Sequence, residues 1–194
     1  MARKPRLVLD EGLYHIIQRG NDRRRVFRQD ADYEQFYLLL KKYLKRYSSF
    51  LHHYCLMSNH LHLILKVMVA QDLPRLMQGI NLSYTLYYKQ RYKFTGSLWQ
   101  GRYKSIIIEK DEYLMECGRY IERNPVRAGM VKDPKDYRFS SFKFYAYGEG
   151  SDIISQDIVY EGLSQDIYER QRKYRDYVLE ERAYDKALDN ILKL

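Results

Sequence analysis

Two histidines, His60 and His62, are the residues of this chain whose spacing most directly suggests chemistry. They lie in a run that alternates polar and apolar residues, which is the pattern of a half-buried strand. The two histidines would share one face of that strand, while Leu61 and Leu63 would face a core. Neighbouring imidazoles can bind one divalent metal ion through neutral nitrogens. A His-x-His pair taken alone is more often structural, so the pair by itself leaves both interpretations open.

Tyr120 and Asn124, near the end of a predicted helix, supply two further candidate groups. They are four residues apart, so they share a face of the helix if its last turn persists. Asn124 can offer a carbonyl oxygen to a hard metal ion, and Tyr120 is placed to attack a phosphodiester polarised by that ion. The 3′-hydroxyl would leave and a 5′-phosphotyrosine would form. Core packing is the default role for one of 21 tyrosines, and Asn124 before Pro125 is an ordinary helix stop.

The periodicity of the apolar residues predicts the elements that must position these groups. The predicted strands are 13–19, 50–56, 60–67 and 103–108, and the predicted helices are 31–47, 73–92 and 112–123. Their order is β-α-β-β-α-β followed by a helix, the ferredoxin-like or RRM-like arrangement of an α+β fold. Both crossovers have the same hand, so the first two helices should cover one face of the sheet. The histidine face is left for the third helix, which should stop before Pro125.

The rest of the chain is expected to extend this domain. Residues 133–150 are rich in aromatic side chains and predict a compact extension, and residues 165–193 predict a terminal helix with a ragged apolar period. The expected organisation is therefore a catalytic domain over residues 1–150. A helical C-terminal extension over residues 151–194 follows it and is not an independent domain.

Charge is unevenly distributed along the chain. The formal net charge is +9, and residues 151–194 hold seven basic and ten acidic residues, a net of −3, so residues 1–150 carry +12. A basic body favours a polyanionic partner such as nucleic acid. The alternative is a solvated basic surface. The candidate DNA contacts are Arg23, Arg24, Arg25, Arg102 and Lys104.

Several features indicate a cytoplasmic protein without a membrane partner. No apolar run approaches the ~20 residues of a membrane span, and the first residues lack the pattern of a secretory signal. Cys55 and Cys117 lie in apolar segments and predict buried free thiols rather than a disulfide or zinc site.

Four short stretches, in a fixed order, carry a resemblance to a known family. They are residues 14–21 (YHIIQRGN), 57–63 (MSNHLHL), 98–105 (LWQGRYKS) and 120–131 (YIERNPVRAGMV). Together with residues 137–141 they span about residues 10–145. These stretches are similar to the HUH-type single-tyrosine transposases, in particular the REP-associated tyrosine transposase branch, where U is an apolar residue.

The resemblance implies a transposase that nicks and rejoins single-stranded DNA through a 5′-phosphotyrosine intermediate, with Mg²⁺ or Mn²⁺. It implies His60 and His62 as metal ligands, Asn124 as the third protein ligand and Tyr120 as the nucleophile. It also implies hairpin-forming DNA from short extragenic palindromes as the partner, with the protein acting as a monomer or a homodimer. The residues after about 150 lie outside the resemblance.

Two rival functions fit parts of the same pattern. A non-catalytic DNA- or RNA-binding regulatory module of RRM-like shape would have the same order of elements. RRM modules stack bases on aromatic side chains of their central strands, whereas a central strand of this chain offers His60 and His62. A metallohydrolase that uses water would also need the histidines, and it predicts turnover that survives Tyr120→Phe. The paired histidines therefore favour an enzyme over a binding module.

Overall fold

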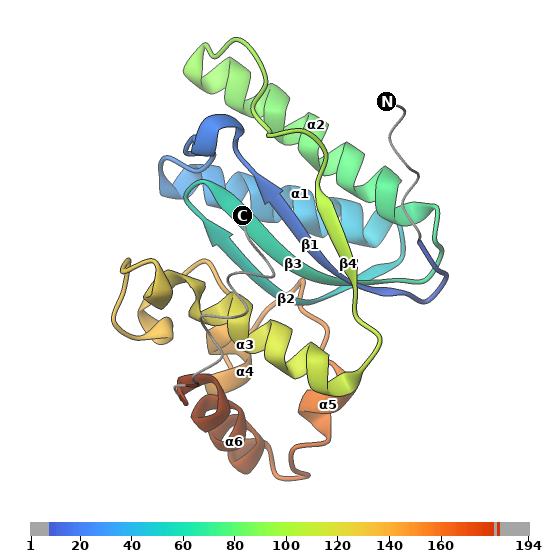
Figure 1. Ribbon diagram of the computed structural model, residues 1–194, viewed down its shortest axis with the longest axis vertical. Coiled ribbons are helices and arrows are strands. Elements are labelled where there is room, and N and C mark those ends of the chain that lie inside the picture. Colours follow the sequence, from blue (N-terminus) through green and yellow to red (C-terminus); the bar gives the residue numbers. More distant parts are fainter. Residues whose placement is uncertain (1–7, 181, 183–194) are drawn as a thin grey trace.

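A four-stranded antiparallel sheet lies at the centre of the computed structural model, which describes residues 8–180 and 182 (Figure 1). The strand order is β2-β3-β1-β4. The strands are β1 (Leu13–Arg19), β2 (Ser49–Met57), β3 (His60–Val67) and β4 (Lys104–Ile107). Strand β1 pairs with β3 and with β4, and β2 pairs with β3. The α+β fold with a β-α-β-β-α-β order is therefore confirmed.

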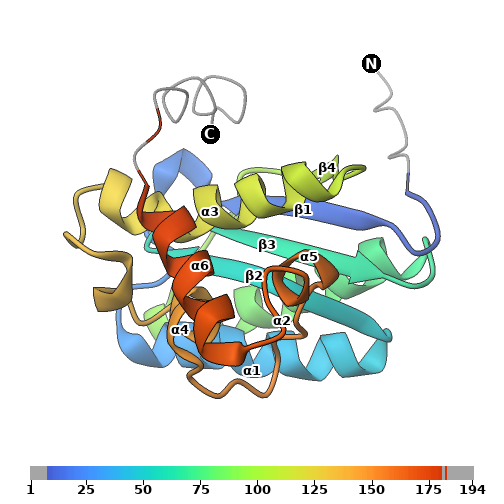
Figure 2. The ribbon, with the colours of Figure 1, turned by 90° about the horizontal axis from the view of Figure 1, so that it is seen from below.

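Helices cover the two faces of the sheet unequally. Helices α1 (Asp30–Arg46) and α2 (Asp72–Tyr92) lie on one face, and α3 (Asp111–Arg127) lies on the other (Figure 2). Leu61, Leu63 and Leu65 of β3 are fully buried in the larger core, which they share with α1 and α2. Ile64 belongs to a second core under α3. The alternation predicted for this strand is thus confirmed, and the histidines lie on the α3 side.

The end of α3 differs from the expected stop before Pro125. The helix continues through Pro125 to Arg127. Asn124 therefore lies within the helix. Its side-chain amide donates to the backbone carbonyl of Tyr120 at 3.1 Å. The real stop is Gly129, with a φ of +66°. Bonds from Gly129 N to Val126 O and from Met130 N to Pro125 O, both 2.9 Å, close the helix as a glycine C-cap.

The C-terminal residues fold back against α3 and β2. The short elements are η1 (Asn21–Arg23) near the start of the chain, then η2 (Pro134–Asp136), α4 (Phe142–Tyr147), α5 (Ile158–Glu161) and α6 (Ile167–Leu179). The predicted helix over 165–193 is therefore shorter, and residues 181 and 183–194 lie outside the described part. The small core of this extension includes Met115 of α3, so α3 itself forms part of that core.

Two segments of irregular backbone, around residues 140 and 154, run along the outer edge of β2. Leu56 N donates to Phe139 O at 2.9 Å, and Ser155 N donates to Leu51 O at 2.8 Å.

The cysteines, Cys55 and Cys117, are free and buried, as predicted. No helix within residues 8–180 is long and apolar enough to cross a membrane.

Candidate active site

The strand register places His60 and His62 side by side on the α3 face of the sheet. His60 lies opposite Arg19 of β1, and His62 lies opposite Ile17. The two imidazole centroids are 5.1 Å apart, with their planes at 85°. His62 is fully buried, and His60 is half-buried at the start of the strand. The pair predicted from the sequence is therefore a close pair in space.

Both rings keep a nitrogen lone pair without a partner. His60 Nδ1–H donates to Asn59 Oδ1 at 2.7 Å, which leaves Nε2 as the unprotonated nitrogen. Nε2 of His60 and Nε2 of His62 are buried and have no hydrogen-bond partner among the described residues. Burial, aided by the nearby Arg19 cation, lowers the pKa of His60 to about 4. Burial also holds the pKa of His62 well below its ordinary value, so both imidazoles are neutral at physiological pH.

His15 of β1 is a site residue that the sequence reasoning treated only as a strand residue. Its Nε2 lies 2.9 Å from Nδ1 of His62, and the two rings are stacked with centroids 5.2 Å apart. Burial lowers the pKa of His15 to about 4, so it is neutral as well. A neutral His15 can accept a hydrogen bond from Nδ1–H of His62, and this arrangement leaves a lone pair on Nε2 of His62. The alternation of residues 13–19 could have placed His15 on this face.

Tyr120 of α3 faces the histidines across the second core. Its ring centroid lies 5.9 Å from that of His62 and 6.5 Å from that of His15. Only 5% of the side chain is exposed. Burial raises the pKa of Tyr120, and the Arg127 cation together with hydrogen bonds from Arg127 and Asn124 acts in the opposite direction. The Arg127 guanidinium lies 4.7 Å from the Tyr120 ring centroid.

These donors fit a metal ion with nitrogen and oxygen ligands. Among residues 8–180 and 182, no group of three or more His, Cys, Asp or Glu side chains is arranged to hold a metal. The two buried lone pairs of His60 and His62 are what an imidazole-bound divalent ion requires. A further ligand must then be an oxygen of another type, and Asn124, on the same helix face as Tyr120, carries an amide oxygen.

The comparison with protein-family models decides the family. The model for transposases described as IS200-like matches residues 9–124, which include His60, His62, Tyr120 and Asn124. The chain belongs to the IS200-like transposase family. A protein of Haemophilus influenzae named as a putative REP-associated tyrosine transposase is 29% identical over an alignment of 104 positions, which covers 45% of this chain and 56% of that protein. The chain therefore matches little more than half the length of that relative.

A solved structure shares the fold of this family member. It is the structure of a REP-associated tyrosine transposase bound to a REP hairpin. The two chains superpose with a TM-score of 0.63 at 19% identity, over 81% of this chain and 93% of that one. At 19% identity this similarity concerns the fold alone. It covers more of the chain than the family model does, and it reaches into the C-terminal extension.

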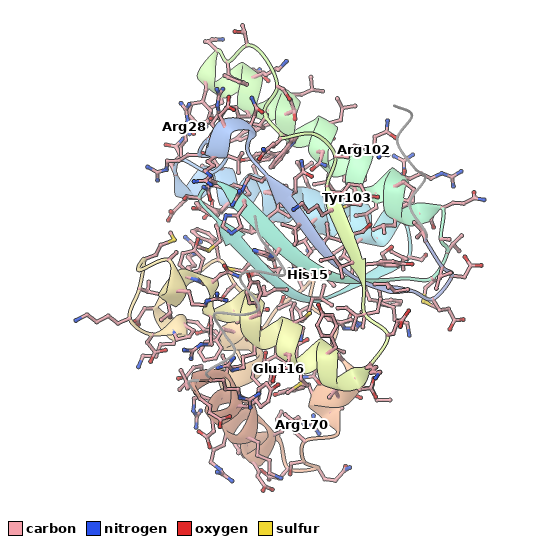
Figure 3. The ribbon with its side chains drawn as sticks, in the orientation of Figure 1. His15, Arg28, Arg102, Tyr103, Glu116 and Arg170 are labelled. Carbon is pink, nitrogen blue, oxygen red and sulfur yellow. The ribbon has the colours of Figure 1, made fainter. Side chains whose placement is uncertain are left out.

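The predicted DNA contacts of this IS200-like chain fall into two groups. Lys104, the first residue of β4, is exposed, and so is Arg102, just before the strand. Figure 3 labels Arg102 at this position. Arg23 and Arg25 are exposed in the turn after β1, and the guanidinium of Arg24 lies 4.3 Å from the ring centroid of Phe94. The first group shares the sheet face of the histidines, because Lys104 lies opposite Ile17.

A buried ionic network holds the helix that carries Tyr120, and the sequence reasoning missed it. Glu122 of α3 and His53 of β2 are both fully buried. Glu122 accepts hydrogen bonds from His53 Nδ1 at 3.0 Å, Ser141 Oγ at 2.6 Å and Tyr174 OH at 2.7 Å. The other nitrogen of His53 donates to Asp157 Oδ2 at 3.2 Å. Strand β2, helix α6 and the residue before α4 therefore meet at one carboxylate of α3, two residues after Tyr120.

Titration of His53 follows from these partners. Burial alone would lower its pKa, but hydrogen bonds to Asp157 and Glu122 outweigh burial and raise the pKa to about 9. His53 is thus a buried cation between two carboxylates at neutral pH. Its sequence position, on the same strand face as Cys55, gave no sign of this charge because the partners come from residues 122 and 157.

Arginines of α3 also bind the C-terminal end of α6. Arg119 Nε donates to Tyr177 O at 3.2 Å, and Arg123 Nη1 donates to Val178 O at 3.0 Å and Leu179 O at 3.1 Å. Cations at a helix C-terminus are favourable because they meet its unsatisfied carbonyls and the negative end of its dipole. The extension and the tyrosine helix are therefore joined by charge as well as by packing.

Proposed function

We propose that this chain is a metal-dependent transposase that cleaves and rejoins single-stranded, hairpin-forming DNA through a 5′-phosphotyrosine at Tyr120. The single observation that carries the proposal is the approach of Tyr120 to the histidine pair, with 5.9 Å between the rings of Tyr120 and His62. The family supports DNA transposition as the process. The relative named as REP-associated and the fold neighbour bound to a REP hairpin support hairpin DNA as the substrate.

In this proposal His60, His62 and Asn124 hold Mg²⁺ or Mn²⁺. The bound ion would polarise the scissile phosphate and neutralise charge that grows on its oxygens. The Tyr120 oxygen attacks phosphorus, the bond from phosphorus to the 3′ oxygen breaks, and the phenol proton is balanced by protonation of the leaving 3′ oxygen. Attack by another 3′-hydroxyl reverses the step, releases Tyr120 and joins two strands. Arg127 assists by stabilising the phenolate form of Tyr120.

The test is a search for the covalent intermediate. The full chain is incubated with Mn²⁺ and labelled single-stranded hairpin DNA from the palindromes that flank its own gene, and the products are separated on a denaturing gel. We expect a protein–DNA adduct that is lost in Tyr120→Phe and in the double variant His60→Ala/His62→Ala. Tyr113→Phe, on the same stripe of α3, is the matched control and should keep the adduct.

Other results would assign another function. Cleavage that persists in Tyr120→Phe would indicate a metallohydrolase that uses water. Binding of several hairpins with neither cleavage nor adduct would indicate a regulatory nucleic-acid-binding module. Mass measurement of the protein in the same buffer tests the expected monomer or homodimer.

A further inference from the structure

A groove of about 230 Å³ lies beside the histidine pair on the same face of the sheet. Its walls are formed by Ile17, Arg19, Gln100, Arg102 and Lys104. Ile17 lies opposite His62 on one side and opposite Lys104 on the other. Residues directly opposite each other in an antiparallel pair point to the same face, so the groove and the histidines lie on one face of the sheet.

Arg19 is a half-buried cation in the wall of this groove. Its Nε is buried with no hydrogen-bond partner among the residues that the structure describes. Leaving a buried donor of a charged group unsatisfied is costly, so the site favours an anion. The groove residues named above include no acidic side chain.

Backbone contacts fix the far wall of the groove to the end of β1. Gln100 N donates to Arg19 O at 2.9 Å, and Gly20 forms a bridge with Trp99. Gln18 Nε2 donates to Gly101 O at 3.4 Å. The chain therefore enters β4 in a set direction, and Figure 3 shows Arg102 at this entry. The cations of the groove thus come from two segments that hydrogen bonds and a bridge join to each other.

We propose that this groove is a phosphate subsite for the DNA strand, in which Arg19 binds the backbone phosphate next to the one attacked by Tyr120. The position follows from the register, since Arg19 lies directly opposite the proposed metal ligand His60. A guanidinium presents a planar fork of donors that matches two phosphate oxygens. Arg102 and Lys104, both exposed, extend the cationic path along the strand. This subsite rests on the proposed function, because it takes the same DNA strand.

The test couples single phosphates to single residues. Hairpin DNAs are made in which one phosphate at a time, around the cleavage junction, is replaced by a neutral methylphosphonate. Their dissociation constants are measured for the full chain and for Arg19→Gln. At one position next to the cleaved bond we expect the methylphosphonate to weaken binding to the unmodified chain about tenfold, the size of one charge-assisted hydrogen bond. The same replacement should have little effect on Arg19→Gln.

Arg24→Gln is the matched control, because it removes the same charge from a side chain that stacks on Phe94 instead of lining the groove. It should weaken binding to all these DNAs by the same factor. Arg19→Lys should recover part of the affinity but not the full coupling, since an ammonium lacks the planar fork. Thermal unfolding of each variant checks the fold, and the exposed Arg102→Gln gives a second coupling measurement if Arg19→Gln is unstable.

The outcomes separate the subsite from the proposed function. The subsite would be overturned if the loss of binding free energy from Arg19→Gln, and that from Arg102→Gln, simply added to the loss from each methylphosphonate. This holds even if the unmodified chain forms the Tyr120 adduct. Coupling at one phosphate without any adduct would support the subsite and refute the tyrosine mechanism. Coupling at a phosphate in the hairpin stem, far from the junction, would also overturn the assignment.

Discussion

His53 of β2 donates its Nδ1–H to the Glu122 carboxylate of α3 across 3.0 Å, and both side chains are fully buried. This contact joins the sheet that carries the histidine pair to the helix that carries Tyr120. Removing one member of a buried ion pair leaves the other charge without compensation, which typically costs about 3–5 kcal/mol. The placement of Tyr120 therefore depends on charge pairing as well as on the apolar core.

Stability should fall as the pH rises through the titration of His53. The pKa of His53 is raised from 6.5 to about 9 in the folded chain, so its contribution is fully present below pH 6.5 and is lost as the pH approaches 9. The loss should be on the order of 3 kcal/mol. Urea unfolding at a series of pH values from 6.5 to about 9 measures it. His53→Gln should be less stable at the lower pH, and its free energy of unfolding should not show this fall with pH. Parallel plots of the free energy of unfolding against pH for the two proteins would contradict the prediction.

Gly118→Ala should destabilise the protein, although alanine favours helices by about 1 kcal/mol over glycine. A Cβ at Gly118 would lie 2.9 Å from Cε1 and 3.0 Å from Nε2 of His53, which is too close for carbon and ring atoms. Overpacking of this kind costs about 1–3 kcal/mol. Gly150→Ala, where a Cβ meets nothing within 4 Å, is the control. Equal melting temperatures for the two variants would show that the His53 ring moves aside freely.

His15→Phe should weaken metal binding without removing a proposed ligand. The phenyl ring fills similar space but cannot accept a hydrogen bond from His62 Nδ1–H, so it no longer favours the His62 tautomer with a lone pair on Nε2. Loss of such a supporting contact typically costs about 10- to 100-fold in metal affinity. Titration with Mn²⁺ by calorimetry measures the effect. His52→Gln is the control, because His52 bonds to Ser155 O instead of to the histidine pair. An Mn²⁺ affinity unchanged in His15→Phe would refute the role.

Arg127→Met should slow adduct formation most at low pH. The Arg127 cation lowers the pKa of Tyr120 against the effect of burial, so its removal should move the rise of the pH–rate profile to higher pH. Below the phenol pKa, the phenolate fraction and the rate fall about tenfold when that pKa rises by one. Arg170→Met removes a similar contact, with Tyr160 at 5.6 Å, and should leave the profile unchanged. If the rate of adduct formation falls but its rise with pH stays at the same pH, the result would assign Arg127 to DNA binding instead.

Local patterns predicted most of the elements that build the site. The strand over residues 13–19 and the strand over 60–67 agree with β1 and β3, because alternation is a local property of one apolar face. The residue that marks the end of α3 is Gly129 and not Pro125, which lies within the helix. A proline within the last turn removes only the bond from its own N–H to the carbonyl four residues before it, and α3 continues to Arg127.

The supporting residues could not be predicted in the same way. His15 contacts a residue 47 positions away, and His53 contacts residues 69 and 104 positions away. Such contacts depend on strand register and on how the extension folds back, which no local pattern encodes. The roles of Tyr120, His60, His62 and Asn124 stay predictions that the adduct experiment tests, although the proximity of Tyr120, His60 and His62 is a property of the fold.

Synthesis from the N-terminus gives the Glu122 network an order of assembly. The strands and Tyr120 leave the ribosome well before Tyr174 and the end of α6, which supply the last hydrogen bonds to Glu122, Arg119 and Arg123. A nascent chain therefore holds its tyrosine helix without those bonds until about residue 180 has emerged. A message that is cut short within α5 or α6 would yield chains in which the helix that carries Tyr120 lacks these hydrogen bonds.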